Sequence, residues 1–440
     1  MSQSHCGLAC SPPGRIFPPE VLALILPNAF GSHIQDFTTY SDNRRHVCLV
    51  CRLWRDVVYL TPSAWCCIPV SLYISQRYVE FCLNKANQSS IFVFFNLLRF
   101  ASLDGTGPLQ TRTPADVANI IFPLFSGAAR IEELKLRASD RTSCATLTSW
   151  VSRTNSGILR RASLILEAPR DRLAESLSLQ PFVGAHELAE LHMGYSILPW
   201  PMEMVYENLT VLGLSHLPMR NPMGWLEVIR VLSATPKLKQ LHLFRVECYH
   251  ASLPESTPVL EHLETLCLTF AHLSGAEIVS YIEMPSLRQL RLDMRQEQGT
   301  VKPSVEGFVR SCHHLLRRLS VLDIGSMHAT LDEVRFLFSC LEAVERLDMR
   351  RASKQLTEDV VNLIIQKALA FRKLRTLELG MPMSCDKLSS LSMALPVDAE
   401  ILLPAPRSGG ALQRCVWTNG VLDITEHYSP PRFPPDHEQL

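Results

Sequence analysis

The sequence has no excess of charge of either sign, because its 43 lysines and arginines are balanced by 43 aspartates and glutamates. This balance argues against a nucleic-acid-binding protein, which usually carries a basic surplus, and against attachment to a membrane surface through basic residues. Long apolar runs are also missing. The longest, Val21–Leu26 and Ile91–Phe95, are far shorter than the roughly 18–20 residues that span a bilayer. We therefore expect no nucleic-acid partner and no membrane partner.

Cysteine is scarce for a disulfide-stabilised protein, with 14 residues in a chain of 440. A chain of this length can build a hydrophobic core without covalent links. Its first residues, MSQSHCGLAC, lack the basic and apolar segments of a secretory signal. We therefore expect reduced thiols and a cytoplasmic or nuclear location.

Motifs of catalysis are absent as well. The sequence contains no G-x-S-x-G, H-E-x-x-H or phosphate-loop motif, and its histidines are scattered. Cys48-x-x-Cys51 followed by Cys66-Cys67 has the residue types of a zinc site but not its spacing. We predict a protein that is not an enzyme and has no catalytic, cofactor or metal site. An enzyme whose catalytic groups lie far apart in sequence is the alternative.

Leucine, in contrast, is abundant: there are 66 leucines, of which only 14 lie in residues 1–130. Beyond residue 130 a short pattern, apolar-x-x-Leu-x-apolar, returns eleven times with a mean spacing of about 28 residues. The Leu-x-Leu step has the period of a β-strand, so both leucines point to one face of a sheet. The central positions of the eleven copies are Leu134, Leu164, Leu191, Leu212, Leu241, Leu266, Leu290, Leu322, Leu347, Leu377 and Cys415.

The segments between these strands carry the signals of helices. Asn221-Pro222 precedes apolar residues at helical spacing, and Thr330-x-x-Glu333 matches a capping box. Strands that alternate with helices predict a right-handed α/β solenoid, whose stacked copies bury one apolar ladder. Residues 129–420 resemble the leucine-rich repeat family, which implies a horseshoe, although the Asn or Cys that usually follows Leu-x-Leu is mostly missing. A plain α/β domain with leucine-rich parallel strands is the alternative.

Residues 15–66 follow a different pattern. The segment 17–21, Phe-Pro-Pro-Glu-Val, suits a helix start. An apolar stripe then runs from Val47 to Val58 through the segment 50–54, Val-Cys-Arg-Leu-Trp, and the segment 63–65, Ser-Ala-Trp, follows. In this order the pieces resemble an F-box, a small helical module that docks on the Skp adaptor of a cullin-type ubiquitin ligase. The resemblance implies that the adaptor-facing residues are Pro18, Pro19, Val21, Leu22, Ile25, Leu49, Val50 and Trp54. The alternative is a helical cap on the repeats, in which Val50 and Trp54 form internal core.

These patterns predict five segments along the chain. Residues 1–14 are expected to be a disordered N-terminus, residues 15–66 an F-box, and residues 67–128 a linking helical region or an irregular first repeat. Residues 129–420 hold about eleven repeats, and residues 421–440, which are rich in proline, are expected to be a disordered tail.

The residue between the two leucines of each copy would lie on the open face of the solenoid, where repeat proteins usually bind partners. At three successive copies this residue is acidic: Asp323, Asp348 and Glu378. Arg346 and Arg350 lie on the same face of one strand and would offset the repulsion among carboxylates on strands about 4.8 Å apart. We hypothesise an acidic stripe that binds a basic segment of a client protein. A solvated surface balanced by arginines is the alternative.

Together the two resemblances imply a substrate-recognition adaptor of an SCF-type ubiquitin ligase. The F-box would dock on the Skp adaptor and through it on a cullin-RING ligase. The repeats would hold an unknown client protein near the ubiquitin-conjugating enzyme and so raise its effective concentration. A leucine-rich-repeat scaffold or interaction protein with no role in ubiquitin ligation is the alternative.

Overall fold

The computed structural model describes residues 17–30, 37–71, 74–97, 118–119, 121–124, 130–139, 143, 146–147, 150, 157–166, 185–194, 206–216, 224–245, 257–270, 278–294, 305–327, 329–369, 371–396, 398–404, 412–418 and 421–427. The predicted disordered N-terminus, residues 1–14, lies outside these ranges. The chain forms two compact units, Met1–Pro199 and Trp200–Leu440. In the described part of the chain, no helix is both long and apolar enough to cross a membrane.

The first unit begins with three α-helices and a short 3-10 helix. They are α1 (Pro19–Ala29), α2 (Phe37–Val50), α3 (Arg52–Leu60) and η2 (Pro62–Trp65). Pro19 suits the first turn of α1 because its missing N–H would have no partner there, and Glu20 interacts favourably with the helix dipole. Both α1 and α2 pack on α3. The described residues of this segment therefore form three helices packed on one another.

Cys51 interrupts the single helical stripe that the sequence predicts from Val47 to Val58. Its backbone is extended, with φ −159° and ψ 170°, and its Sγ accepts the backbone N–H of Trp54 at 3.5 Å. Cys51 is thus the N-cap of α3, and Val50 and Trp54 lie on different helices. The prediction of one continuous stripe is wrong because helical spacing alone does not reveal one extended residue between two helices.

Arg44 joins α2 to the elements that follow it. Its side chain is 3% exposed and donates to the carbonyl oxygen of Ala64 at 3.0 Å and to the hydroxyl of Tyr78 at 2.6 Å. Its guanidinium carbon also lies 4.6 Å from the ring centroid of Trp65. Because a buried cation is costly unless it is paired, these contacts hold α2 against η2 and α4 (Gln76–Ala86).

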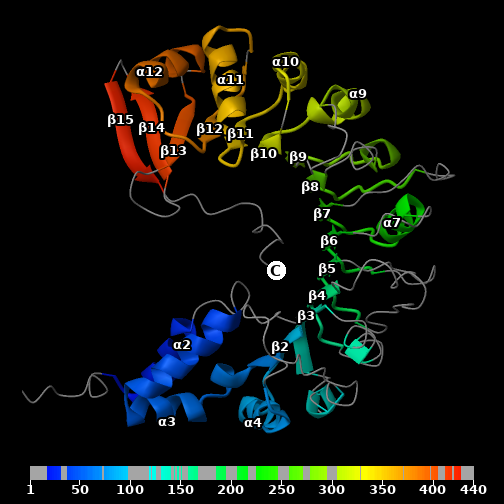
Figure 1. The fold of residues 1–440 in the computed structure, drawn as a ribbon, viewed down its shortest axis with the longest axis vertical. Helices are drawn as coiled ribbons and strands as arrows, with labels where there is room; N and C mark the ends of the chain where they lie inside the picture. The colour runs from blue at the N-terminus through cyan, green and yellow to red at the C-terminus, as the bar shows by residue number, and fades with distance from the viewer. Residues whose placement is uncertain are drawn as a thin grey trace, which may run out of the picture. The chain divides into compact units, whose positions relative to one another are not determined.

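The described residues of the first unit continue into a parallel sheet whose strands follow chain order (Figure 1). β1 and β2 lie in the range 67–128, where the sequence predicts a linking region or an irregular first repeat. Strand pairing of the later type therefore begins before residue 129. The strands are β1 (Cys67–Ser71), β2 (Ile91–Leu97), β3 (Ile131–Ala138), β4 (Arg161–Leu166) and β5 (Glu190–Gly194).

The register of β4 corrects one copy of the predicted repeat. Leu134 of β3 pairs with Ala162 and not with Leu164, so Ala162 holds the central position. Ser163 then stands where the pattern placed Ile165. A shift of two residues keeps every side chain on the same face, so alternation alone could not exclude the more leucine-rich register.

The second unit contains a longer parallel sheet, again in chain order. Its parallel strands are β6 (Val211–Ser215), β7 (Gln240–Phe244), β8 (Thr265–Phe270), β9 (Gln289–Met294), β10 (Val321–Met327), β11 (Arg346–Met349), β12 (Thr376–Leu379) and β13 (Glu400–Pro404). Its helices are α7 (Gly224–Ser233), η5 (Ile278–Tyr281), α9 (Val305–Leu316), α10 (Leu331–Ser339), α11 (Lys354–Ile365) and α12 (Cys385–Ala394).

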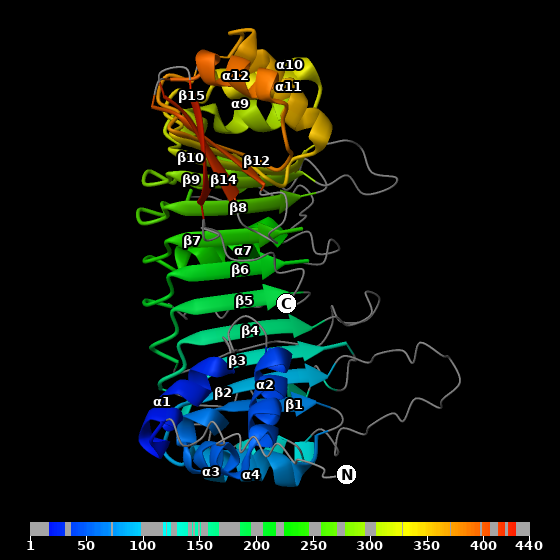
Figure 2. The same ribbon diagram turned by 90° about the vertical axis from the view of Figure 1, so that its left-hand side faces the viewer.

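The helices α7, α9, α10 and α11 lie on one side of this sheet (Figure 1), and Figure 2 shows the other face of strands β6 to β10, with α7 behind the sheet. The capping box predicted at α10 is present: Thr330 and Glu333 each bond the other's backbone N–H. The arrangement is an α/β fold of the solenoid type, in which one face of the sheet is left without described helices.

The leucine ladder forms the core of the second unit. Each central leucine of seven successive strands is at most 3% exposed. Burying a leucine side chain stabilises a fold by about 1.5–3 kcal/mol, so the row is a principal source of stability. The seven residues are Leu212, Leu241, Leu266, Leu290, Leu322, Leu347 and Leu377.

The end of the second unit differs from the prediction. The strand that follows β12 in the ladder is β13, in which Ile401 pairs with Leu377, so the copy predicted at Cys415 is misplaced. Cys415 lies in β14 (Leu412–Thr418), which is antiparallel to β13. β15 (Val421–His427) pairs with β14 where the sequence predicts a disordered tail. The remaining residues, 428–440, lie outside the described ranges.

Replacing Arg44 by leucine should lower the free energy of unfolding by about 2–4 kcal/mol, because the buried Ala64 carbonyl and Tyr78 hydroxyl both lose their donor. Urea unfolding of the full chain measures this change. The adjacent Arg45 is exposed, so Arg45→Leu is the matched control and should stay within about 0.5 kcal/mol of the parent. Equal effects of the two substitutions would contradict the role given to Arg44.

Candidate functional site

Four charged residues form one row across the second unit's sheet. Arg291 pairs with Asp323, Asp323 with Asp348, and Asp348 with Glu378, on strands β9 to β12. Each lies between two apolar residues of its strand, so their side chains stand on the face opposite the leucine ladder. The structure therefore brings together the three acidic residues named from the sequence.

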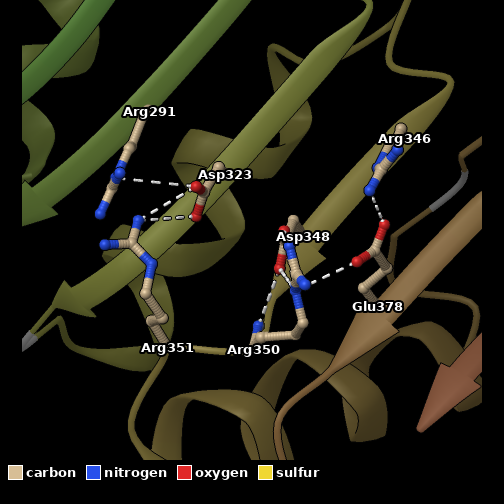
Figure 3. Close-up of polar contacts among 7 residues, drawn as sticks. All are labelled: Arg291, Asp323, Arg346, Asp348, Arg350, Arg351 and Glu378. Atoms are coloured by element: carbon tan, nitrogen blue, oxygen red, sulfur yellow. Dashed lines mark hydrogen bonds and ion pairs between the residues drawn. The ribbon is translucent and has the colours of Figure 1, made fainter. Parts of the chain in front are cut away.

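Asp323 is held by arginines from two sides. It is 3% exposed, and its two carboxylate oxygens accept Nη2 of Arg351 at 3.1 and 3.0 Å (Figure 3). Nε of Arg291 lies 3.7 Å from the same carboxylate. Arg351 reaches it from the turn that follows β11, whereas Arg291 stands on the neighbouring strand β9.

Asp348 and Glu378 share Arg350. Nε of Arg350 donates to both oxygens of Asp348 at 3.0 and 3.1 Å, and its Nη2 donates to Oδ2 at 2.5 Å. The same Nε lies 3.1 Å from Oε2 of Glu378, whose other oxygen pairs with Arg346. Asp348 is 4% exposed and Glu378 0% exposed. We call Arg291, Asp323, Arg346, Asp348, Arg350, Arg351 and Glu378 the guanidinium cluster.

Burial and neighbouring charges act on Glu378 in opposite directions. Desolvation raises the pKa of its carboxyl above the ordinary value of 4.5, and the Asp348 charge raises it further. Arg346 and Arg350 oppose this rise. The hydrogen bond to Asp348 raises the pKa of the Arg350 guanidinium, so Arg350 stays charged throughout the accessible pH range.

Gly380 permits the position of Arg350. A Cβ atom on Gly380 would lie 2.1 Å from the carbonyl oxygen of Arg350, which is closer than any side chain allows. The turn after β12 therefore packs directly on the backbone that carries the shared guanidinium. A glycine is required here by close approach of two backbones.

Sequence reasoning missed two members of the cluster. The pairing of Arg291 with Asp323 follows from strand register, which composition does not reveal. Arg351 lies beyond the end of β11, where the period of two no longer predicts the direction of a side chain. The alternative stated from the sequence is a solvated surface on which arginines balance the carboxylates. Arginines do pair with the carboxylates here, but the carboxylates are buried and not solvated.

A second candidate site is the apolar surface of the three N-terminal helices. Of the residues named from the F-box resemblance, Pro18, Pro19, Ile25, Leu49 and Val50 are exposed, whereas Val21 and Trp54 are half-buried. Leu22 is only 2% exposed, so this residue contributes to the packing among the helices and not to their outer surface.

Sequence reasoning missed other apolar side chains on this surface. Leu24 is 73% exposed and Leu60 80% exposed, and Phe17 and Tyr59 are exposed as well. The sequence does not predict the exposure of these side chains. An apolar residue on a helix is expected in the core, and only its neighbours in the folded protein show whether it is covered. We call the exposed Phe17, Pro18, Pro19, Leu24, Ile25, Leu49, Val50, Tyr59 and Leu60 the apolar helix surface.

The described residues hold no group of three or more His, Cys, Asp or Glu side chains that could bind a metal ion. The cysteines considered for zinc have other surroundings: Cys51 caps α3, and Cys66 and Cys67 are buried. Burial raises the pKa of the Cys67 thiol to about 12, so this thiol stays protonated at neutral pH.

Comparisons with known proteins add little to this description. No protein-family model matches the chain, and no curated protein matches it. One similar solved structure is a Bacteroides fragilis protein determined by the Northeast Structural Genomics Consortium. It is 11% identical, with a TM-score of 0.31, and the match covers 64% of this chain and 67% of that chain. A likeness at this level says nothing about function.

Gly380→Ala should lower the free energy of unfolding by about 1–3 kcal/mol, because the new methyl group forces the Arg350 backbone to move. Gly157→Ala is the matched control, since no atom lies within 4 Å of its added Cβ, and it should change stability by less than about 0.5 kcal/mol. Chemical denaturation compares the two. A neutral Gly380→Ala would show that the turns are not packed as described.

Glu378→Gln should flatten the pH dependence of stability. The raised pKa of Glu378 means that the folded protein holds this proton more tightly than the unfolded chain does, so this residue's contribution falls as pH rises above 4.5. The free energy of unfolding of the variant should therefore decline less than that of the parent between pH 4.5 and about 7. Glu345→Gln, at an exposed side chain just before β11, is the matched substitution for comparison. A steeper decline in Glu378→Gln would overturn the assignment.

Proposed function

We propose that the chain is a substrate-recognition adaptor of an SCF-type ubiquitin ligase, acting in the cytoplasm or nucleus. The observation that carries the proposal is the apolar helix surface, on which large apolar side chains of three mutually packed helices remain exposed. Large apolar side chains that stay exposed on a folded domain favour an interaction site, because leaving them in water is unfavourable.

The sequence order of this module supports an F-box-like docking role. Val50 at the end of α2 and Trp54 on α3 lie in the segment that resembles the F-box helix, and Trp65 follows it. Trp65 is 5% exposed and its indole N–H donates to the carbonyl oxygen of Val58 at 2.8 Å. Trp65 therefore belongs to the internal support of the module, and the docking contacts are assigned to the exposed side chains.

The open face of the repeat sheet is the proposed client-binding region. Asp323, Asp348, Glu378, Arg346 and Arg350 lie there together. With the adaptor at one surface and a client at another, the chain would raise the local concentration of client lysines near a charged ubiquitin-conjugating enzyme. The transfer reaction itself would be performed by other subunits.

The test replaces two exposed side chains of the apolar helix surface. Leu49 and Val50 are 71% and 52% exposed, so Leu49→Asp with Val50→Asp should leave folding intact. We expect this double variant to lose co-purification with the Skp adaptor, because charges would be buried in an apolar interface. Affinity capture of the tagged full chain, followed by detection of the adaptor, measures the loss.

Met393→Asp is the matched control, since Met393 is 71% exposed on α12 of the second unit. It should retain the adaptor in full. If the wild-type chain captures no Skp adaptor, or if the Leu49/Val50 double variant captures as much as the control, the proposal fails. The chain would then be interpreted as a repeat scaffold without a role in ubiquitin ligation.

A further inference from the structure

The charge that the guanidinium cluster offers to a partner is set by which side chains reach the solvent. The side chains of Arg350 and Arg351 are 28% and 32% exposed, whereas those of Asp323 and Asp348 are 5% and 6% exposed. Glu378 is 0% exposed. A partner approaching this part of the sheet therefore meets guanidinium groups first, although the row beneath them is acidic.

The geometry of Arg350 leaves donors available. Its contacts with Asp348 and Glu378 use Nε and Nη2, and no hydrogen bond or ion pair joins Nη1 to the described residues. A guanidinium carries five N–H donors in one plane, so a group fixed along one edge by a carboxylate can bind a second carboxylate along another edge. Because Asp348 and Glu378 also hold Arg350 in place, little side-chain entropy is lost on binding.

A basic partner would face a different situation. Its lysine or arginine would have to displace an arginine from a carboxylate that is already paired, at positions with 4% exposure or less. Separating a buried ion pair leaves an uncompensated charge and is strongly unfavourable. The carboxylates thus orient the arginines rather than serving as contacts for a basic segment.

We propose that the guanidinium cluster binds an acidic segment of a client protein, with aspartate or glutamate side chains of that segment contacting Arg350 and Arg351. The two arginines are consecutive in sequence and follow β11, so their side chains lie along one side of the row of buried carboxylates, beyond the C-terminal end of its inner strand (Figure 3). This inference deepens the proposed function by giving the chemical class of the client segment, and it replaces the basic client expected from the sequence.

The test measures binding of two labelled decapeptides to the full chain by fluorescence anisotropy. One peptide alternates glutamate with glycine and the other alternates lysine with glycine. The glutamate peptide should bind more tightly, and its affinity should fall as salt is raised. Arg350→Gln with Arg351→Gln should weaken it by about tenfold or more, the loss expected for charge-assisted hydrogen bonds.

The matched control removes two arginines elsewhere in the same unit. The side chains of Arg317 and Arg335 are 59% and 48% exposed and pair with single carboxylates, so Arg317→Gln with Arg335→Gln changes the net charge equally. This control should keep the parental affinity within about twofold. An equal loss in the control would show a general charge effect and overturn the proposal.

A second variant removes the risk that unpaired aspartates unfold the protein. Asp348→Asn with Arg350→Gln deletes both members of one ion pair and leaves the net charge unchanged. The proposal requires this variant, too, to bind the glutamate peptide less tightly than the parent does. Unchanged binding, tighter binding of the lysine peptide, or no binding of the glutamate peptide to the parent would each overturn it.

These measurements use the chain without the Skp adaptor, so they separate the two proposals. Loss of the adaptor interaction with retained peptide binding would contradict the ligase role alone. Retained adaptor capture without any peptide binding would contradict the acidic-segment proposal alone.

Discussion

In-register parallel pairing is the constraint on which the rest of the second unit depends. Once Leu290, Leu322, Leu347 and Leu377 pair across successive strands, the residue after each leucine must also lie beside its neighbours. Strands in a sheet are about 4.8 Å apart, so three successive acidic residues become three adjacent carboxylates. Their mutual repulsion has to be offset by cations at short range, and the arginines of the guanidinium cluster do this.

The need to balance the three carboxylates also determines which charged groups the open face of the sheet exposes to solvent. Arginine suits it better than lysine, because one planar guanidinium can pair with two carboxylates, as Arg350 does with Asp348 and Glu378. The carboxylates lie against the sheet and the arginines extend past them, so packing converts an acidic sequence stripe into a surface that exposes positive charge. The N-terminal helices differ, because several of their large apolar side chains, including Leu24, Leu49 and Leu60, are exposed to water.

Much of the fold could be predicted from the sequence, because Leu-x-Leu reports directly on which side chains share a face. Nine of the predicted central positions agree with the observed strand register. The failures have physical causes. The central position of β4 is Ala162, which a search for leucine does not find. The central position of β13 is Ile401, which lies in an apolar run that does not alternate with polar residues. The leucine pattern therefore predicts the wrong central residue for both copies. The break at Cys51 and the reach of Arg351 from a turn depend on backbone direction, which periodicity does not record.

We propose that the apolar helix surface docks on the Skp adaptor, and calorimetric titration of the full chain with the purified adaptor would measure this docking. We expect a one-to-one complex whose formation has a negative heat-capacity change, since apolar surface is removed from water. Absence of binding, or binding with a heat-capacity change near zero, would contradict it.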